Sequence, residues 1–129
     1  MIDAHFEALE TAIISDPLVI STDLHRAYTS IETGYVKGEI TFIDGSCLVV
    51  FQHVRIEEEK LTVTDYRYHY MTPDNKLIFR YDNAPHYPEI DTFPHHKHLP
   101  SGARGAAMPS VKHVLAEIDA IVIEKVTQC

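Results

Sequence analysis

Residues 66–98 concentrate the side chains of this chain that could do chemistry. The stretch holds five of the nine histidines and five of the seven tyrosines, together with two arginines. A guanidinium presents a planar fork to phosphate oxygens, and an imidazole can move protons near neutral pH. A tyrosine can stack on a base or donate its hydroxyl hydrogen. The combination indicates a surface suited to a phosphate-bearing substrate.

Part of this set falls on two predicted strands, 61–71 and 77–82, joined by a turn at 72–76. Alternation places Arg67 and His69 on one face of the first strand and its tyrosines on the other. A three-residue loop with Asn75 as a bulge pairs residue 68 with 80, which sets the tyrosines beside the polar residues of the second strand. A two-residue turn pairs 67 with 80 and gathers one charged face: Arg67, His69, Arg80 and Asp82. A one-residue slip exchanges the two arrangements, and both stay open.

A long irregular loop rich in histidine and proline is expected at residues 83–108. Its histidines could bind a transition metal, act as general acid or base, or hold the loop by hydrogen bonds. No two-histidine helical motif and no cysteine accompanies them, so we expect neither a bound metal nor another cofactor. Nearby carboxylates leave a histidine–carboxylate metal site open as an alternative. The four loop histidines are His86, His95, His96 and His98.

The remaining elements are expected to form a scaffold of the α+β class. Apolar residues recur at helical spacing over 2–14 and after Pro109. Between them lie five predicted strands, at 18–32, 35–43, 46–56, 61–71 and 77–82. The Asp44-Gly45 pair predicts a two-residue type I′ hairpin turn. We therefore expect an antiparallel sheet of about five strands with an N-terminal and a C-terminal helix packed on it.

Length and composition set further limits. A chain of 129 residues is expected to form a single domain, residues 1–129. Its net charge of −8 argues against general adhesion to nucleic acid or to an anionic membrane, although Arg67, Arg80 and Lys97 could make a local basic patch. Cys47 and Cys129 have no metal-type spacing and do not indicate a disulfide framework. We expect a cytoplasmic protein without a secretory signal or a membrane span.

Three segments together resemble a known family. They are Tyr66-Arg67-Tyr68-His69, the run from Phe79 to His86, and Thr92-Phe93-Pro94-His95-His96-Lys97-His98. These segments are similar to the TumE family of prokaryotic toxins, which are encoded beside a short antitoxin, TumA. The resemblance covers roughly residues 17–126. It implies a toxin that arrests growth until a cognate, TumA-like antitoxin binds it.

The leading hypothesis is a toxin that acts on RNA as a ribonuclease, by metal-independent attack of the 2′-hydroxyl. Its predicted catalytic residues are His69, His86, His96 and Asp82. Its predicted substrate-binding residues are Arg67, Arg80, Lys97, Tyr68 and Tyr81. We expect the antitoxin to cover the surface of residues 66–98, since occlusion is the simplest form of inhibition.

Two other hypotheses stay open. In one, the chain is a non-enzymatic binding module whose same face contacts a protein partner or the ribosome. In the other, it is a metal-dependent hydrolase built on the histidines of the loop. A homo-oligomer is compatible with each hypothesis.

Overall fold

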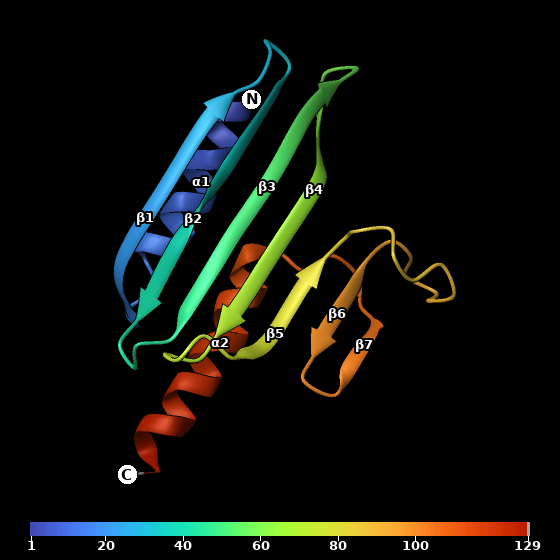
Figure 1. Ribbon diagram of the computed structural model, residues 1–129. Helices are drawn as coiled ribbons and strands as arrows, with labels where there is room; N and C mark the ends of the chain where they lie inside the picture. The colour runs from blue at the N-terminus through green and yellow to red at the C-terminus, as the bar shows by residue number, and fades with distance from the viewer. Residues whose placement is uncertain (129) are drawn as a thin grey trace.

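The computed structural model in Figure 1 describes residues 1–128 as two helices and one seven-stranded antiparallel sheet. The helices are α1 (Ile2–Ile14) and α2 (Val111–Thr127). The strands are β1 (Val19–Tyr28), β2 (Thr33–Phe42), β3 (Cys47–Glu57), β4 (Lys60–Met71), β5 (Leu77–Asp82), β6 (His96–Leu99) and β7 (Gly102–Gly105). They lie side by side in chain order, and each strand pairs antiparallel with the next one.

Both helices lie on the same side of the sheet, α1 behind β1 and β2 and α2 behind the lower part of β4 and β5 in Figure 1. The side chains between them form the core, because alternate residues of each strand point to this side. Tyr66, Tyr68 and Tyr70 of β4 are each at most 3% exposed there. No helix covers the other side of the sheet within residues 1–128. We call the first side the helix face and the second the open face.

The structure confirms the α+β class and the two terminal helices, but the prediction of about five strands was too low. The two additional strands, β6 and β7, lie inside the region 83–108 that was predicted as loop. Each is only four residues long, and such short segments carry little periodicity. The connection that remains irregular after β5 spans residues 83–95. Of the two cysteines, Cys47 is free and half-buried, whereas Cys129 lies outside the described residues.

The turn between β2 and β3 also differs from the prediction. Positive φ occurs at Gly45 (+85°) but not at Asp44, so the turn is not of type I′, which needs it at both central positions. The Phe42 amide donates to the Ser46 carbonyl across a longer loop. The Asp44 carboxylate accepts from the Ser46 amide at 3.0 Å, which stabilises this alternative.

The hairpin of β4 and β5 begins in the register predicted for a three-residue loop and then shifts to one that neither prediction gave, with Arg67 paired to Asp82. Asn75 has φ +65° and Met71 pairs with Leu77, as expected for a three-residue loop. A β-bulge then leaves Ile78 without a cross-strand partner, and Tyr70 pairs with Phe79. This one-residue shift exchanges the faces. The arginines, the histidine and the acid of the two strands therefore share one face, and the tyrosines point into the core.

Candidate functional site on the open face

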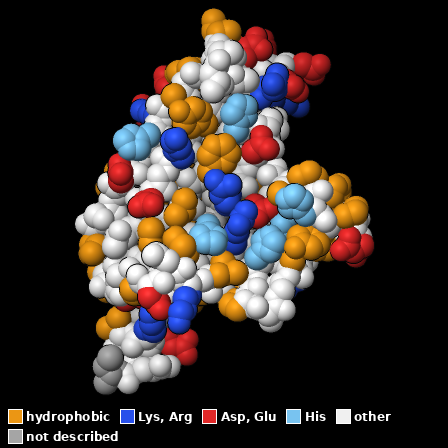
Figure 2. All heavy atoms as spheres, viewed as in Figure 1, with side chains coloured by type: hydrophobic (Ala, Val, Ile, Leu, Met, Phe, Trp, Pro, Cys, Tyr) orange, Lys and Arg blue, Asp and Glu red, His pale blue; other side chains and the backbone are white. Residues whose placement is uncertain are grey.

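Two rows of three side chains cross β4, β5 and β6 on the open face. Cross-strand pairing gives the first row as Arg67, Asp82 and His96, and the second as His69, Arg80 and His98. Residues two apart on a strand point to the same side, so all six side chains face one way. Figure 2 shows Lys, Arg and His side chains gathered over the middle of this face. We call these six residues the two-row site.

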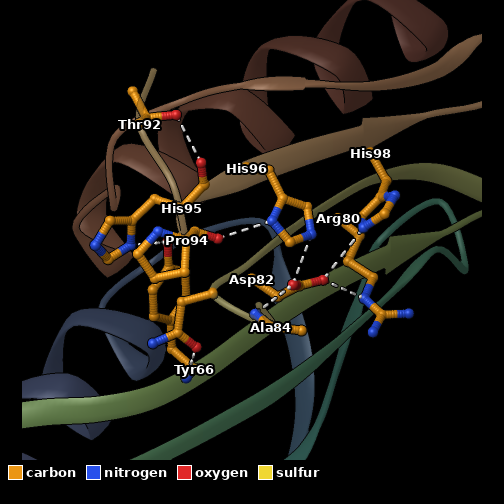
Figure 3. Close-up of polar contacts among 10 residues, drawn as sticks. Tyr66, Arg80, Asp82, Ala84, Thr92, Pro94, His95, His96 and His98 are labelled. Atoms are coloured by element: carbon orange, nitrogen blue, oxygen red, sulfur yellow. Dashed lines mark hydrogen bonds and ion pairs between the residues drawn. The ribbon is translucent and has the colours of Figure 1, made fainter. Parts of the chain in front are cut away.

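Asp82 connects the two rows. Its side chain is only 4% exposed, and its Oδ2 accepts a hydrogen bond from Nε of Arg80 at 2.9 Å. Oδ1 accepts from the Ala84 amide at 3.0 Å and lies 2.8 Å from Nε2 of His96. Nε2 of His98 lies 3.5 Å from Oδ2 (Figure 3). A buried carboxylate with these partners is held in one position, so it orients the guanidinium and both imidazoles.

His96 is fixed from its other side as well. Its Nδ1 lies 2.9 Å from the carbonyl oxygen of Pro94, and the side chain is 1% exposed. The strand thus buries His96 against Asp82, while its neighbour His98 keeps 25% of its side chain exposed. His98 is therefore the imidazole of β6 that a ligand on the open face can reach.

The local environment favours the neutral form of two histidines. Burial lowers the pKa of His69, and the nearby charges of Arg80 and Arg67 lower it further. Burial also lowers the pKa of His98, an effect that the Asp82 carboxylate opposes without cancelling. Nδ1 of His69 is a buried atom without a hydrogen-bond partner among residues 1–128. The lowered pKa of His69 thus favours the neutral imidazole, which is the form that a general base requires.

The connection between β5 and β6 contributes an aromatic wall to the site. The ring of Tyr87 packs edge-on against His96 and His98, with centroid distances of 5.1 and 5.8 Å. Thr92 anchors the connection, since its hydroxyl donates to the His95 carbonyl at 2.6 Å and accepts from the Ala106 amide at 3.0 Å. The loop is thus tied to β7 and keeps Tyr87 against the histidines.

Three of the predicted substrate-binding residues lie on the helix face, away from the two-row site. Lys97 donates to Glu117 of α2 at 2.6 Å, and Tyr81 donates to the same carboxylate at 2.7 Å. Tyr68 is 1% exposed and accepts a hydrogen bond from Gln52 at 2.6 Å. These side chains have partners inside the protein, and they are separated from the two-row site by the sheet itself.

The other predicted residues lie in or beside the two-row site. It contains Arg67, His69, Arg80, Asp82 and His96. His86 is exposed on the loop after β5, near enough for its charge to lower the pKa of His98. The structure brings these residues to one face, and their roles in catalysis or binding remain predictions.

Residue types alone did not single out two other members of this surface, Tyr87 and Phe51. His98 was among the four candidate histidines of the loop but not among the predicted catalytic residues, and its i+2 spacing from His96 puts both on one side of a strand. Phe51 pairs with Arg67 across β3 and β4, and the Arg67 guanidinium lies 5.6 Å from its ring centroid. Nothing in the sequence indicates which face the loop residue Tyr87 contacts.

The described residues form an α+β protein in which one sheet face is uncovered and carries guanidinium, imidazole and aromatic groups. A family model described as Toxin TumE matches residues 9–127. The chain therefore belongs to the TumE toxin family, and this match confirms the resemblance found in the sequence. The family places the chain among the toxins of toxin–antitoxin systems. An antitoxin is thus the implied partner. No curated protein and no solved structure matches the chain. Within residues 1–128, the structure contains no helix of the length and apolar character that a membrane crossing requires.

Proposed function

We propose that this toxin acts on RNA as a ribonuclease through the two-row site and that its cognate antitoxin neutralises it. The observation that supports the proposal is the meeting of Arg67, His69 and Arg80 on the open face, with the buried Asp82 behind them. The chain as a whole carries a net charge of −8, so this positive cluster is a local feature. Local guanidinium groups attract phosphates even when the rest of the surface is acidic.

The phosphate group of the RNA would bind between the two arginines. Arg67 is exposed on β4, whereas Arg80 is half-exposed and has its Nε held by Asp82. This contact leaves the outer nitrogens of Arg80 directed away from the carboxylate, which is the arrangement needed for a forked contact with phosphate oxygens. Phe51, beside Arg67, offers a ring on which a base can stack.

Cleavage in this proposal uses the 2′-hydroxyl of the RNA as nucleophile. His69 takes the hydroxyl proton, the oxygen attacks phosphorus, and a 2′,3′-cyclic phosphate forms as the bond to the 5′-oxygen breaks. His86, from the loop, gives a proton to the leaving 5′-oxygen. The lowered pKa of His69 supports its role as base, because it favours the neutral imidazole that a base requires. Asp82 acts as a positioning residue for Arg80.

The test is induction of the toxin in a bacterial host, with and without its neighbouring antitoxin gene, followed by analysis of total RNA. Discrete fragments that end in 2′,3′-cyclic phosphate are expected with the unaltered toxin alone. Arg80→Ala should abolish them. Arg55→Ala is the matched control, because Arg55 is also an exposed arginine of the sheet but lies at the far end of β3, and it should leave the fragments unchanged.

Other outcomes would redirect the assignment. Growth arrest with intact RNA would overturn the ribonuclease proposal and favour a binding module that acts on a protein or the ribosome. RNA fragments that persist in the Arg80→Ala variant would show that cleavage does not take place at the two-row site. Circular dichroism of both purified variants verifies that each one is folded.

A further inference from the structure

We propose that Asp82, His96 and His98 bind a divalent transition-metal ion. One donor atom from each side chain can be chosen such that all three lie within 4.8 Å of one another. The histidines come from β6 and the carboxylate from the paired position of β5. Two imidazoles and one carboxylate form a donor set that suits Zn²⁺ and other first-row divalent metals. This inference goes beyond the proposed ribonuclease activity and does not depend on it.

The hydrogen bonding of His96 points to a cation between the rings and the carboxylate. Its Nδ1 lies 2.9 Å from the Pro94 carbonyl oxygen, which can only accept a hydrogen bond, so Nδ1 carries the hydrogen. In the neutral ring the lone pair of Nε2 then points toward Asp82. Nε2 is buried and makes no hydrogen bond, although it lies 2.8 Å from Oδ1 of Asp82. Two acceptor atoms at that separation need a proton or a metal ion between them.

The hydrogen bond from Nδ1 of His96 to the Pro94 carbonyl is also of the kind that orients a metal-binding histidine. Such a residue commonly donates its second ring N–H to a backbone carbonyl, which fixes the tautomer and the ring orientation. Pro94 supplies that carbonyl, and Figure 3 shows the ring held between it and Asp82. Arg80 plays the equivalent part for the carboxylate, because its Nε donates to Oδ2 at 2.9 Å. Both ligand types are therefore oriented from outside the cluster.

The distances leave room for an ion after a small adjustment. Ligand atoms at 2.0–2.2 Å from a tetrahedral ion lie about 3.3 Å from each other. Nε2 of His98 is already 3.5 Å from Oδ2 of Asp82. The separation of 2.8 Å between His96 and Asp82 must widen by about 0.5 Å to reach that spacing. Once the buried pair has widened, a rotation of the partly exposed His98 ring can bring its nitrogen to the ion.

Three protein ligands leave one position of a tetrahedral ion free, as in catalytic rather than structural zinc sites. The 25% exposure of the His98 side chain places the free position toward the open face. Tyr87 packs against both imidazoles and shields the remaining side. The free position would hold water or an oxygen of a bound phosphate. Mg²⁺ and Ca²⁺ should bind poorly, because they prefer sets made of oxygen ligands.

Metal titration of the purified full-length chain, without an affinity tag, tests this site. After removal of bound metal with a chelator, calorimetry with Zn²⁺ should give one ion per chain, and Mg²⁺ should give no signal. Co²⁺ should give the absorption bands of a tetrahedral complex with nitrogen and oxygen ligands. His98→Ala should weaken Zn²⁺ binding by at least about tenfold. It is preferred over a variant of His96, whose buried ring supports the fold.

The control variant is His25→Ala. His25 also lies on the sheet and has its Nε2 2.8 Å from a carboxylate, that of Asp23, but neither residue belongs to the three-donor group. Zn²⁺ binding that is equal in the unaltered chain and in His98→Ala, or no binding to the unaltered chain, would overturn the proposal and assign a shared proton to the His96–Asp82 contact. The readout involves no RNA, so a negative result here is distinct from failure of the ribonuclease proposal.

Discussion

Asp82 lies between one guanidinium and two imidazoles, and this arrangement determines which groups of the two-row site can react. Arg80 and His96 are both held by the carboxylate, so they position rather than exchange protons with a ligand. His69 stands outside these contacts, and burial together with Arg80 and Arg67 lowers its pKa and favours its neutral form. At the scale of single residues, His69 is therefore the group whose protonation should govern cleavage.

The pH dependence of RNA cleavage follows from the lowered pKa of His69. Burial and two neighbouring arginines shift it below the ordinary 6.5, so the ring gains its proton only in more acidic solution than a free histidine does. A base must be neutral, and the acidic limb of the pH–rate profile should therefore lie below pH 6.5. The measurement is a pH–rate profile on a short RNA, with His69→Gln as the comparison.

His69→Gln should lower the rate by about 100-fold, the scale of general base catalysis, and remove the acidic limb of the profile. An unchanged limb in that variant would mean that another group titrates. An acidic limb centred above pH 7 in the unaltered toxin would contradict the lowered pKa of His69. Thermal unfolding of both proteins, at each pH, separates loss of chemistry from loss of fold.

The sequence predicted much of the site because the chemistry depends on residue types. Arginine, histidine and aspartate are recognisable wherever they lie, and alternation already paired Arg67 with His69 on one face. The sequence could not predict on which face the residues of β5 would fall. The bulge at Ile78 decides it, and no residue type at that position signals an unpaired residue. Lys97 was predicted to bind substrate because the sequence does not show on which face of the sheet it lies. Pairing with Tyr81 of β5 places it on the helix face.

At the scale of elements, Lys97 and Glu117 connect the end of the sheet to α2. The Lys97 side chain is 9% exposed, and its ammonium lies 2.6 Å from the Glu117 carboxylate and 4.8 Å from the Tyr81 ring centroid. Burial alone would lower the pKa of Lys97, but the hydrogen bonds that its ammonium makes with Glu117 and Tyr81 outweigh it and raise the pKa. The pair therefore holds a charged lysine inside the protein.

Breaking this pair should destabilise the fold more than it affects RNA contacts. Glu117→Gln leaves a buried ammonium without its counter-charge, and the free energy of unfolding should fall by about 3 kcal/mol. Urea denaturation measures the change. Glu124→Gln, on the exposed side of the same helix, is the control and should stay within about 0.5 kcal/mol. An unaffected stability in Glu117→Gln would show that the pair adds little to the packing of α2.

The helices were predictable from sequence because α1 and α2 bury regular apolar stripes. Ile2, Phe6, Leu9 and Ile13 of α1 are buried at the spacing that the pattern indicates. The short strands β6 and β7 carry no comparable pattern, because their side chains serve the site, the lysine pair and the loop instead of one apolar face. Their existence follows from the pairing of β6 with β5 and of β7 with β6, which is a property of the sheet and not of either segment.

For the molecule as a whole, the main asymmetry is that one sheet face is covered by helices and the other is not. The TumE family implies an antitoxin partner, and we expect it to occupy the open face, where it would block the two-row site. The exposed Arg67 is a direct probe of that contact. Its charge reversal leaves the core untouched, because the side chain points away from the helices.

Arg67→Glu should weaken antitoxin binding by at least about tenfold, or about 1.4 kcal/mol. Lys112→Glu, an exposed lysine of α2 on the opposite side of the molecule, should bind normally. The dissociation constants can be measured with purified toxin variants and the antitoxin. If Lys112→Glu weakened antitoxin binding and Arg67→Glu did not, the antitoxin would bind on the helices. It would then have to inhibit the toxin without covering the two-row site.

The chain order of the seven strands also fixes when the site can form during translation. Each strand pairs with the one made just before it, so the sheet can grow from β1 as the polypeptide leaves the ribosome, N-terminal part first. His96 and His98 lie on β6, near the end of that sequence. A nascent chain interrupted before β6 would carry most of the sheet but only four of the six residues of the site. Translation therefore completes the two-row site late, after most of the sheet that supports it has been made.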